Sequence, residues 1–79
     1  MTERTVLYVA RWKNGRTKDV HLSTCAGLDP QWPGVGAALV FGDDLYRVAE
    51  VTRGESVVFD GRLYQGDGEF PVVVWMEVV

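Results

Sequence analysis

The sequence VLYVARWKNGRTKDVHL, residues 6–22, decides the fold class of this 79-residue chain. Strand-forming residues lie on both sides of Asn14-Gly15, the pair best able to take the positive φ angles of a two-residue type I′ turn. The pattern predicts an antiparallel hairpin in which Tyr8 faces His21 and Leu7 faces Leu22. At its tip Arg11 faces Lys18 and Lys13 faces Arg16, provided that the loop does not have three residues.

The rest of the chain continues this pattern of short apolar runs separated by turn residues. A long connection at 23–36 contains two prolines and three glycines, and turns follow at 42–44, 60–61 and 66–68. No segment keeps an apolar period of 3.6 residues with caps at its ends. We therefore expect one all-β domain over residues 1–79, in which six short strands close into a small barrel without exposed edges.

Residues 35–59 carry turn glycines and apolar residues at the spacing of a strand meander. The positions concerned are Gly42, Tyr46, Val48, Val51, Gly54 and Phe59. This stretch, about a third of the chain, resembles the meander of SH3-like small barrels. The resemblance implies a fold and no site residues, because such barrels serve peptide binding, nucleic-acid binding, assembly and catalysis alike.

Composition excludes several classes of protein. With 47% hydrophobic and 11% aromatic residues the chain folds, and a net charge of −3 lacks the basicity of a general nucleic-acid binder. The charge is uneven, with five cations against two anions in residues 1–20 and three against nine in residues 21–79. A single cysteine closes no intrachain disulfide, and no apolar run approaches the roughly 20 residues of a membrane span. We expect a cytoplasmic protein without a membrane partner.

Residues with catalytic or metal-binding chemistry are few. Asp19 and His21 are two apart on one strand and share a face, and Cys25 follows, so an Asp-His-Cys arrangement can be drawn. The alternative is a half-exposed His21 packed on its cross-strand partner Tyr8. A structural zinc site needs about four N or S ligands, and one His and one Cys supply two, although a site shared between subunits stays open. The sequence predicts no enzyme, no cofactor and no metal site.

The tip of the hairpin is a stronger candidate for a binding site. In the register above its cations Arg11, Lys13, Arg16 and Lys18 project from one face, beside Trp12. Like charges directly across strands are unfavourable by a few tenths to about 1 kcal/mol. The arrangement therefore indicates either an acidic partner that relieves the repulsion or a solvated tip that protects a sheet edge.

Two further features bear on partners. Trp32 lies in the Pro/Gly-rich connection, where it either plugs the open end of the barrel or anchors an interface. The last strand, with Val73 and Trp75, is apolar on both faces, as are residues 6–10. A barrel wall needs one apolar face, so the outer face should be covered by the long connection, a second copy or another protein.

These features favour a non-enzymatic binding module that self-associates or docks on a protein with an acidic surface. An accessory or inhibitor protein, such as phages and mobile elements encode, fits this size. The alternative is a barrel that binds nucleic acid or an anionic small ligand such as a nucleotide. There the tip cations would contact phosphates, and Trp12 or Trp32 would stack on bases.

Overall fold

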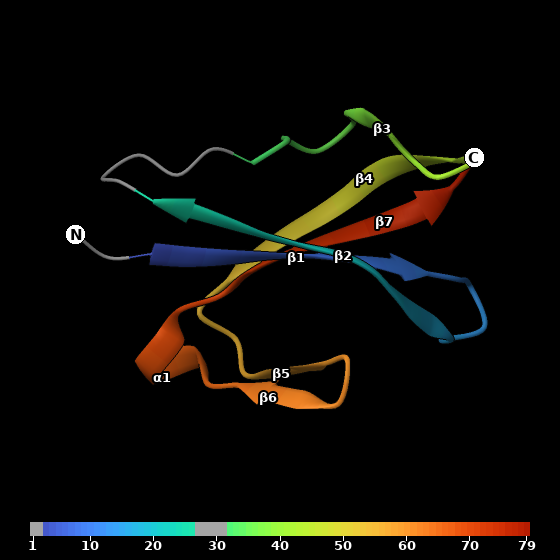
Figure 1. The fold of residues 1–79 in the computed structure, drawn as a ribbon. Helices are drawn as coiled ribbons and strands as arrows, with labels where there is room; N and C mark the ends of the chain where they lie inside the picture. Colours follow the sequence, from blue (N-terminus) through green and yellow to red (C-terminus); the bar gives the residue numbers. More distant parts are fainter. Residues whose placement is uncertain (1–2, 27–31) are drawn as a thin grey trace.

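A computed structural model describes residues 3–26 and 32–79 of the chain, and most of them lie in β-strands (Figure 1). The strands are β1 Glu3–Arg11, β2 Thr17–Ala26, β3 Ala38–Phe41, β4 Asp44–Arg53, β5 Val57–Phe59, β6 Arg62–Tyr64 and β7 Val72–Val78, with one helical turn, α1 Gly66–Glu69. The order β2-β1-β7-β4-β3 forms a five-stranded sheet, and β5 and β6 form a separate hairpin. The all-β prediction is confirmed.

The first and last strands form the centre of the sheet. β1 and β7 pair in parallel from Val6↔Val72 to Ala10↔Met76, whereas the other neighbouring strands of this sheet are antiparallel. A parallel pair requires a long crossover between its strands. Here the crossover consists of everything between β1 and β7, so the two ends of the sequence hold the sheet together.

The first hairpin forms as predicted at its base and differs at its tip. Tyr8 faces His21 and Leu7 faces Leu22, but the register then shifts, so that Ala10 faces Lys18. The shift is a β-bulge at Val20, an extra residue that period-2 alternation does not reveal. It follows that the predicted pair Arg11–Lys18 is wrong.

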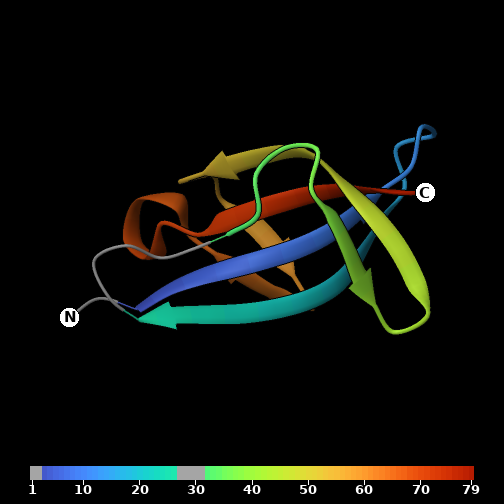
Figure 2. The same cartoon turned by 90° about the horizontal axis from the view of Figure 1, so that it is seen from above.

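Curling of the sheet produces a half-barrel (Figure 2). A second bulge interrupts the pairing of β4 with β7 between Val48 and Glu50, and bulges increase local twist and bend a strand. The edge strands β2 and β3 approach through side chains, since the ring of His21 stacks on Phe41 with centroids 5.2 Å apart. Ladder hydrogen bonds do not join these edges within the described residues, and closure into a six-stranded SH3-like barrel is not confirmed.

The concave face of the sheet holds the larger core. Its buried residues are Val6, Ala10, Tyr46, Val48, Val72, Val74 and Met76. Half-buried side chains at the rim, including Tyr8, Leu39 and Phe41, pack against them. Each inward residue is separated by one position from the next on its strand, except where a bulge intervenes.

The convex face is covered by the β5–β6 hairpin, which lies beneath the sheet in Figure 1. Phe59 and Tyr64 of this hairpin pack on Leu7, Val9 and Val73, which are buried. The chain therefore covers both apolar faces of β1 and β7 itself. The expectation that a second copy or a partner covers them loses its basis, while the long connection contributes Trp32 to the concave core.

Asp19 fixes this hairpin to the sheet. Its carboxylate accepts a hydrogen bond from the backbone N–H of Asp60, 2.9 Å away, in the turn between β5 and β6. Asp60 and Gly61 have φ angles of 51° and 78°, which is the pattern of a type I′ turn. The predicted turn at 60–61 is confirmed.

The long connection is described only from Trp32 onward, where residues 32–37 contain no regular element. Residues 27–31 of the predicted connection lie outside the described residues, and β2 extends to Ala26, beyond its predicted end. The only helix among the described residues has four residues, too few to cross a membrane.

Gly66 in α1 provides a test of packing. A Cβ atom built there would collide with the backbone oxygen of Gly54, whereas a Cβ on Gly68 would meet open space. We expect Gly66→Ala to lower the free energy of unfolding by about 2 to 3 kcal/mol. Gly68→Ala, the control, should change it by less than about 1 kcal/mol. Urea denaturation measures both, and equal stabilities would contradict the packing of α1 on residues 54–56.

Candidate binding site at the hairpin tip

The tip of the first hairpin is a three-residue loop, Lys13-Asn14-Gly15. The backbone N–H of Gly15 donates to the backbone carbonyl of Trp12 (3.0 Å), and the backbone N–H of Trp12 donates to the backbone carbonyl of Arg16 (2.9 Å). Gly15 has a φ of 88°, and a turn followed by a residue of positive φ is typical of a three-residue hairpin loop. Asn14 Oδ1 accepts the N–H of Arg16 at 3.0 Å and completes the turn. The condition on the predicted register is therefore not met, and Lys13 does not face Arg16.

The tip carries an exposed tryptophan. Trp12 is 41% exposed, although a side chain of this size is usually mostly buried. Arg16 lies across from Trp12, and Lys18 lies opposite Ala10, so both stem from the face of Trp12. Lys13, Arg16 and Lys18 are exposed, and no ion pair within the described residues engages them. The tip thus presents an aromatic ring beside Arg16 and Lys18, with Lys13 in the loop.

Arg11 belongs to the opposite face. Its guanidinium lies 5.0 Å from the centroid of the Trp75 ring and 3.5 Å from Glu50 of β4. Trp75 donates its indole N–H to Thr52 Oγ1 at 3.2 Å. The prediction that all four cations share one face is wrong, because the three-residue loop and the bulge move Arg11 away from Arg16 and Lys18 and give it an anionic partner.

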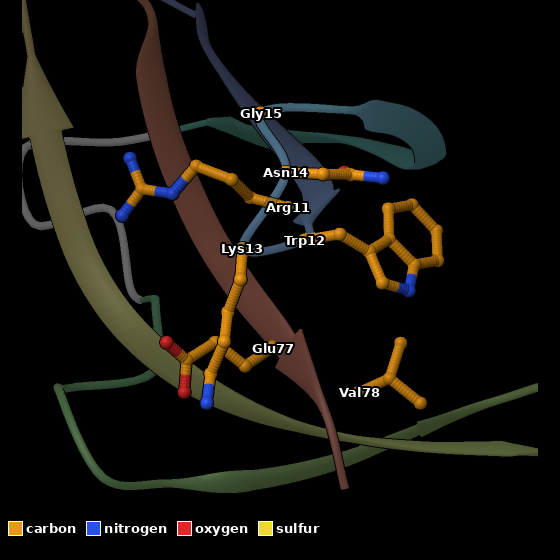
Figure 3. Close-up of a pocket in the computed structure, with 7 residues that line it drawn as sticks. All are labelled: Arg11, Trp12, Lys13, Asn14, Gly15, Glu77 and Val78. Atoms are coloured by element: carbon orange, nitrogen blue, oxygen red, sulfur yellow. The ribbon is translucent and has the colours of Figure 1, made fainter.

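A hollow of about 780 Å³ lies between the hairpin tip and the end of β7 (Figure 3). Its lining residues are Arg11, Trp12, Lys13, Asn14, Gly15, Glu77 and Val78. The β1–β7 ladder stops at Ala10↔Met76, so Arg11 and Glu77, the next residues, are not paired. The two strands diverge there, and we name this hollow the fork.

The two sides of the fork differ in chemistry. In Figure 3 the Lys13 side chain points toward Glu77, while the Trp12 ring and Val78 lie on the other side of the strands. One side is charged and the other is apolar. A second, smaller hollow is lined by Trp12, Asn14, Arg16, Thr17 and Lys18. Trp12 therefore borders two depressions.

The remaining predicted site residues lie elsewhere. Trp32 is half-buried and packs against the concave core, with the guanidinium of Arg53 5.8 Å from its ring centroid. Val73 has no exposed surface, so it does not line a docking surface, and Trp75 is partly buried against the convex core. Of the eight predicted residues, the structure gathers five at the tip.

Asp19 and His21, the first two residues of the Asp-His-Cys arrangement, do not come together. The bulge at Val20 places Asp19 on the convex face, against the β5–β6 turn, while His21 joins Tyr8 and Phe41 on the concave face. His21 is exposed, and the centroid of its ring lies 5.7 Å from that of Tyr8. This agrees with the alternative prediction of a histidine packed on its cross-strand partner Tyr8. The side chain of Cys25 lies outside the described residues. Within the described part, no three His, Cys, Asp or Glu residues gather to hold a metal.

Tyr46 is a buried tyrosine of the concave core. Burial raises the pKa of its phenol, and the neighbouring Asp44 carboxylate raises it further. Its hydroxyl therefore stays protonated and donates to Asp44 Oδ2 at 3.4 Å. A phenol held in this state is a hydrogen-bond donor and not a base.

Glu77 and Val78 were missed by sequence reasoning. They join the site because β1 and β7 pair in parallel and then diverge, which is a contact across nearly the whole chain. The only available signal was the shared apolar character of the two terminal strands. Alternation within each strand does not reveal the direction of pairing.

Comparisons with protein-family models, curated protein sequences and solved structures gave no match to this chain.

The geometry of the tip loop predicts a difference between two substitutions at Gly15. Ala at a positive φ costs roughly 1 to 2 kcal/mol, while Asn tolerates this region better. We expect Gly15→Ala to speed hydrogen exchange of the Trp12 amide about tenfold, because that amide closes the loop. Gly15→Asn should change it by less than about threefold. Equal exchange rates in the two variants would contradict the three-residue loop.

Proposed function

We propose that this protein is a non-enzymatic binding module that docks on the acidic surface of a protein partner through the tip of its first hairpin. The single observation that carries the proposal is the exposed Trp12 beside the cations Arg16 and Lys18, on a projecting hairpin whose loop adds Lys13. Tryptophan and arginine are enriched at the energetic centres of protein interfaces. Unpaired cations around such an anchor favour an acidic partner.

A protein partner suits the whole molecule better than a long polyanion. The net charge of the chain is −3, so a nucleic acid that extended beyond the tip would meet a repulsive surface. The tip itself supplies only a local positive patch. A protein with a matching local acidic patch gains from the tip and avoids the rest.

Nucleic acid or a nucleotide is the second candidate. Trp12 lines two hollows and has cations beside it, which favours stacking on a base together with contacts to phosphate. Self-association lacks a comparable observation, since β5 and β6 cover the apolar strands that suggested it. The accessory or inhibitor role, the cytoplasmic location and the relation to SH3-like barrels stay predictions.

Photo-crosslinking tests the proposal. A crosslinking amino acid with an aromatic side chain, which keeps a ring at position 12, should capture protein from a lysate of the cells that encode this chain, and nuclease treatment should leave the products unchanged. The same amino acid at position 58, where Val58 is 63% exposed on the β5–β6 hairpin, is the matched control. Capture of nucleic acid alone, or equal products at both positions, would overturn docking through the tip.

Electrostatic attraction at the tip predicts a dependence on salt. Replacing Arg16 and Lys18 by Gln should slow association with the captured partner several-fold at low ionic strength and less at high ionic strength, because exposed charges are screened. Replacing Arg53 by Gln, an exposed cation at the other end of β4, is the control. Stopped-flow kinetics measure the rates. An association rate of the double variant equal to that of the control at low salt would count against a role of the tip cations.

A further inference from the structure

The fork contains an open backbone edge at the end of β7. Val79 donates its N–H to the oxygen of Leu45 in β4, at 3.0 Å. Successive N–H groups of a strand point to opposite edges, so the N–H of Val78 points toward β1 and into the fork. The β1–β7 register ends at Ala10↔Met76, and no described strand continues the ladder beside Val78.

The β1 side of the fork is open in the same way. Trp12 donates its N–H to Arg16 across the hairpin, so this amide faces β2. The carbonyl of Arg11, one residue earlier and the last residue of β1, points to the opposite edge, toward the fork. Two backbone edges, from β1 and from β7, therefore border a hollow of about 780 Å³.

We infer that the fork binds an extended acidic peptide, whose backbone pairs with β7 where its edge is open, at Val78. Main-chain hydrogen bonds from an open strand edge are a recurring mode of peptide recognition, with side-chain specificity coming from alternate positions. This inference rests on the proposed function, because it names the part of the partner that the tip would contact.

The side chains around the fork predict the pattern of the peptide. Residues of a strand point alternately to its two sides. On one side they would meet the Trp12 ring and Val78, and on the other Lys13, Arg11 and Glu77. Glu77 lies opposite Arg47 in the β4–β7 register, so a neighbouring cation offsets its charge. The fork therefore fits a segment in which apolar and acidic residues alternate.

Other occupants fit less well. A nucleic acid has no backbone amide that could pair with a strand edge. A second copy of this chain would have to offer an alternating apolar and acidic edge, and its longest edge strand, β2, carries Lys18 and Asp19 in adjacent positions. These occupants become outcomes of the experiment.

The experiment uses synthetic peptides and the full chain. The probe is an eight-residue peptide of alternating Glu and Val with blocked ends, and the matched control has the same composition as a block of four Glu followed by four Val. Isothermal titration at low salt should show at least tenfold tighter binding of the alternating peptide. Methylation of alternate backbone nitrogens in that peptide should weaken its binding at least tenfold.

Two variants at one position test the backbone edge. Val78→Pro removes the N–H that faces the fork, while Val78→Ala keeps it and removes most of the side chain. We expect Val78→Pro to weaken peptide binding at least fivefold relative to Val78→Ala, with both proteins folded by circular dichroism. Val58→Ala, on the other hairpin, should bind the peptide like the original chain.

Several results would overturn the inference. They are equal binding of the alternating and block peptides, equal binding by the two Val78 variants, and displacement of the peptide by an eight-residue oligothymidylate at equal concentration. If these occur while position 12 still crosslinks to protein, the proposed docking through the tip stands and only the extended-strand mode is wrong. If position 12 gives no crosslinks to protein, and the peptide binds Trp12→Ala as tightly as it binds the original chain, then docking through the tip and the extended-strand mode beside Trp12 are both wrong.

Discussion

The parallel pairing of β1 with β7 is the constraint on which the rest of the structure depends. It places the two ends of the sequence at the centre of the sheet and makes each of them apolar on both faces, as in parallel sheets generally. Two covers are then needed in a chain of 79 residues. Curling of β3 and β4 supplies the first, and the β5–β6 hairpin, fixed by Asp19 and the convex core, supplies the second.

The sequence was most informative where structure is decided locally. Asn14-Gly15 located the first hairpin, Asp60-Gly61 located the third, and the pair Tyr8–His21 had the correct register. The sequence was least informative where a single extra residue or a contact between distant parts of the chain decides the structure. The bulge at Val20 shifted the tip register, and the covering of Val73 by Phe59 depends on a contact that no local pattern encodes.

The bulge at Val20 also decides which chemistry the molecule can assemble. Without it Asp19 and His21 would share a face, and all four tip cations would crowd together. With it Asp19 serves the β5–β6 turn, His21 joins the aromatic rim, and Arg11 finds Glu50 and Trp75. One irregular residue thus separates side chains with structural roles from those left free at the tip.

In the proposed complex, the contacts available at the fork would contribute unequally to binding. An intramolecular hydrogen bond is worth about 1 kcal/mol net, and exposed ion pairs contribute roughly 0.2 to 1 kcal/mol each. Burial of the exposed 41% of Trp12, about 100 Å² at about 25 cal/mol per Å², adds on the order of 2.5 kcal/mol. Affinity would therefore depend first on Trp12. In the proposed complex the cations would govern the rate of encounter, and the edge at Val78 would select an extended chain, because its N–H donates only to a carbonyl placed in register.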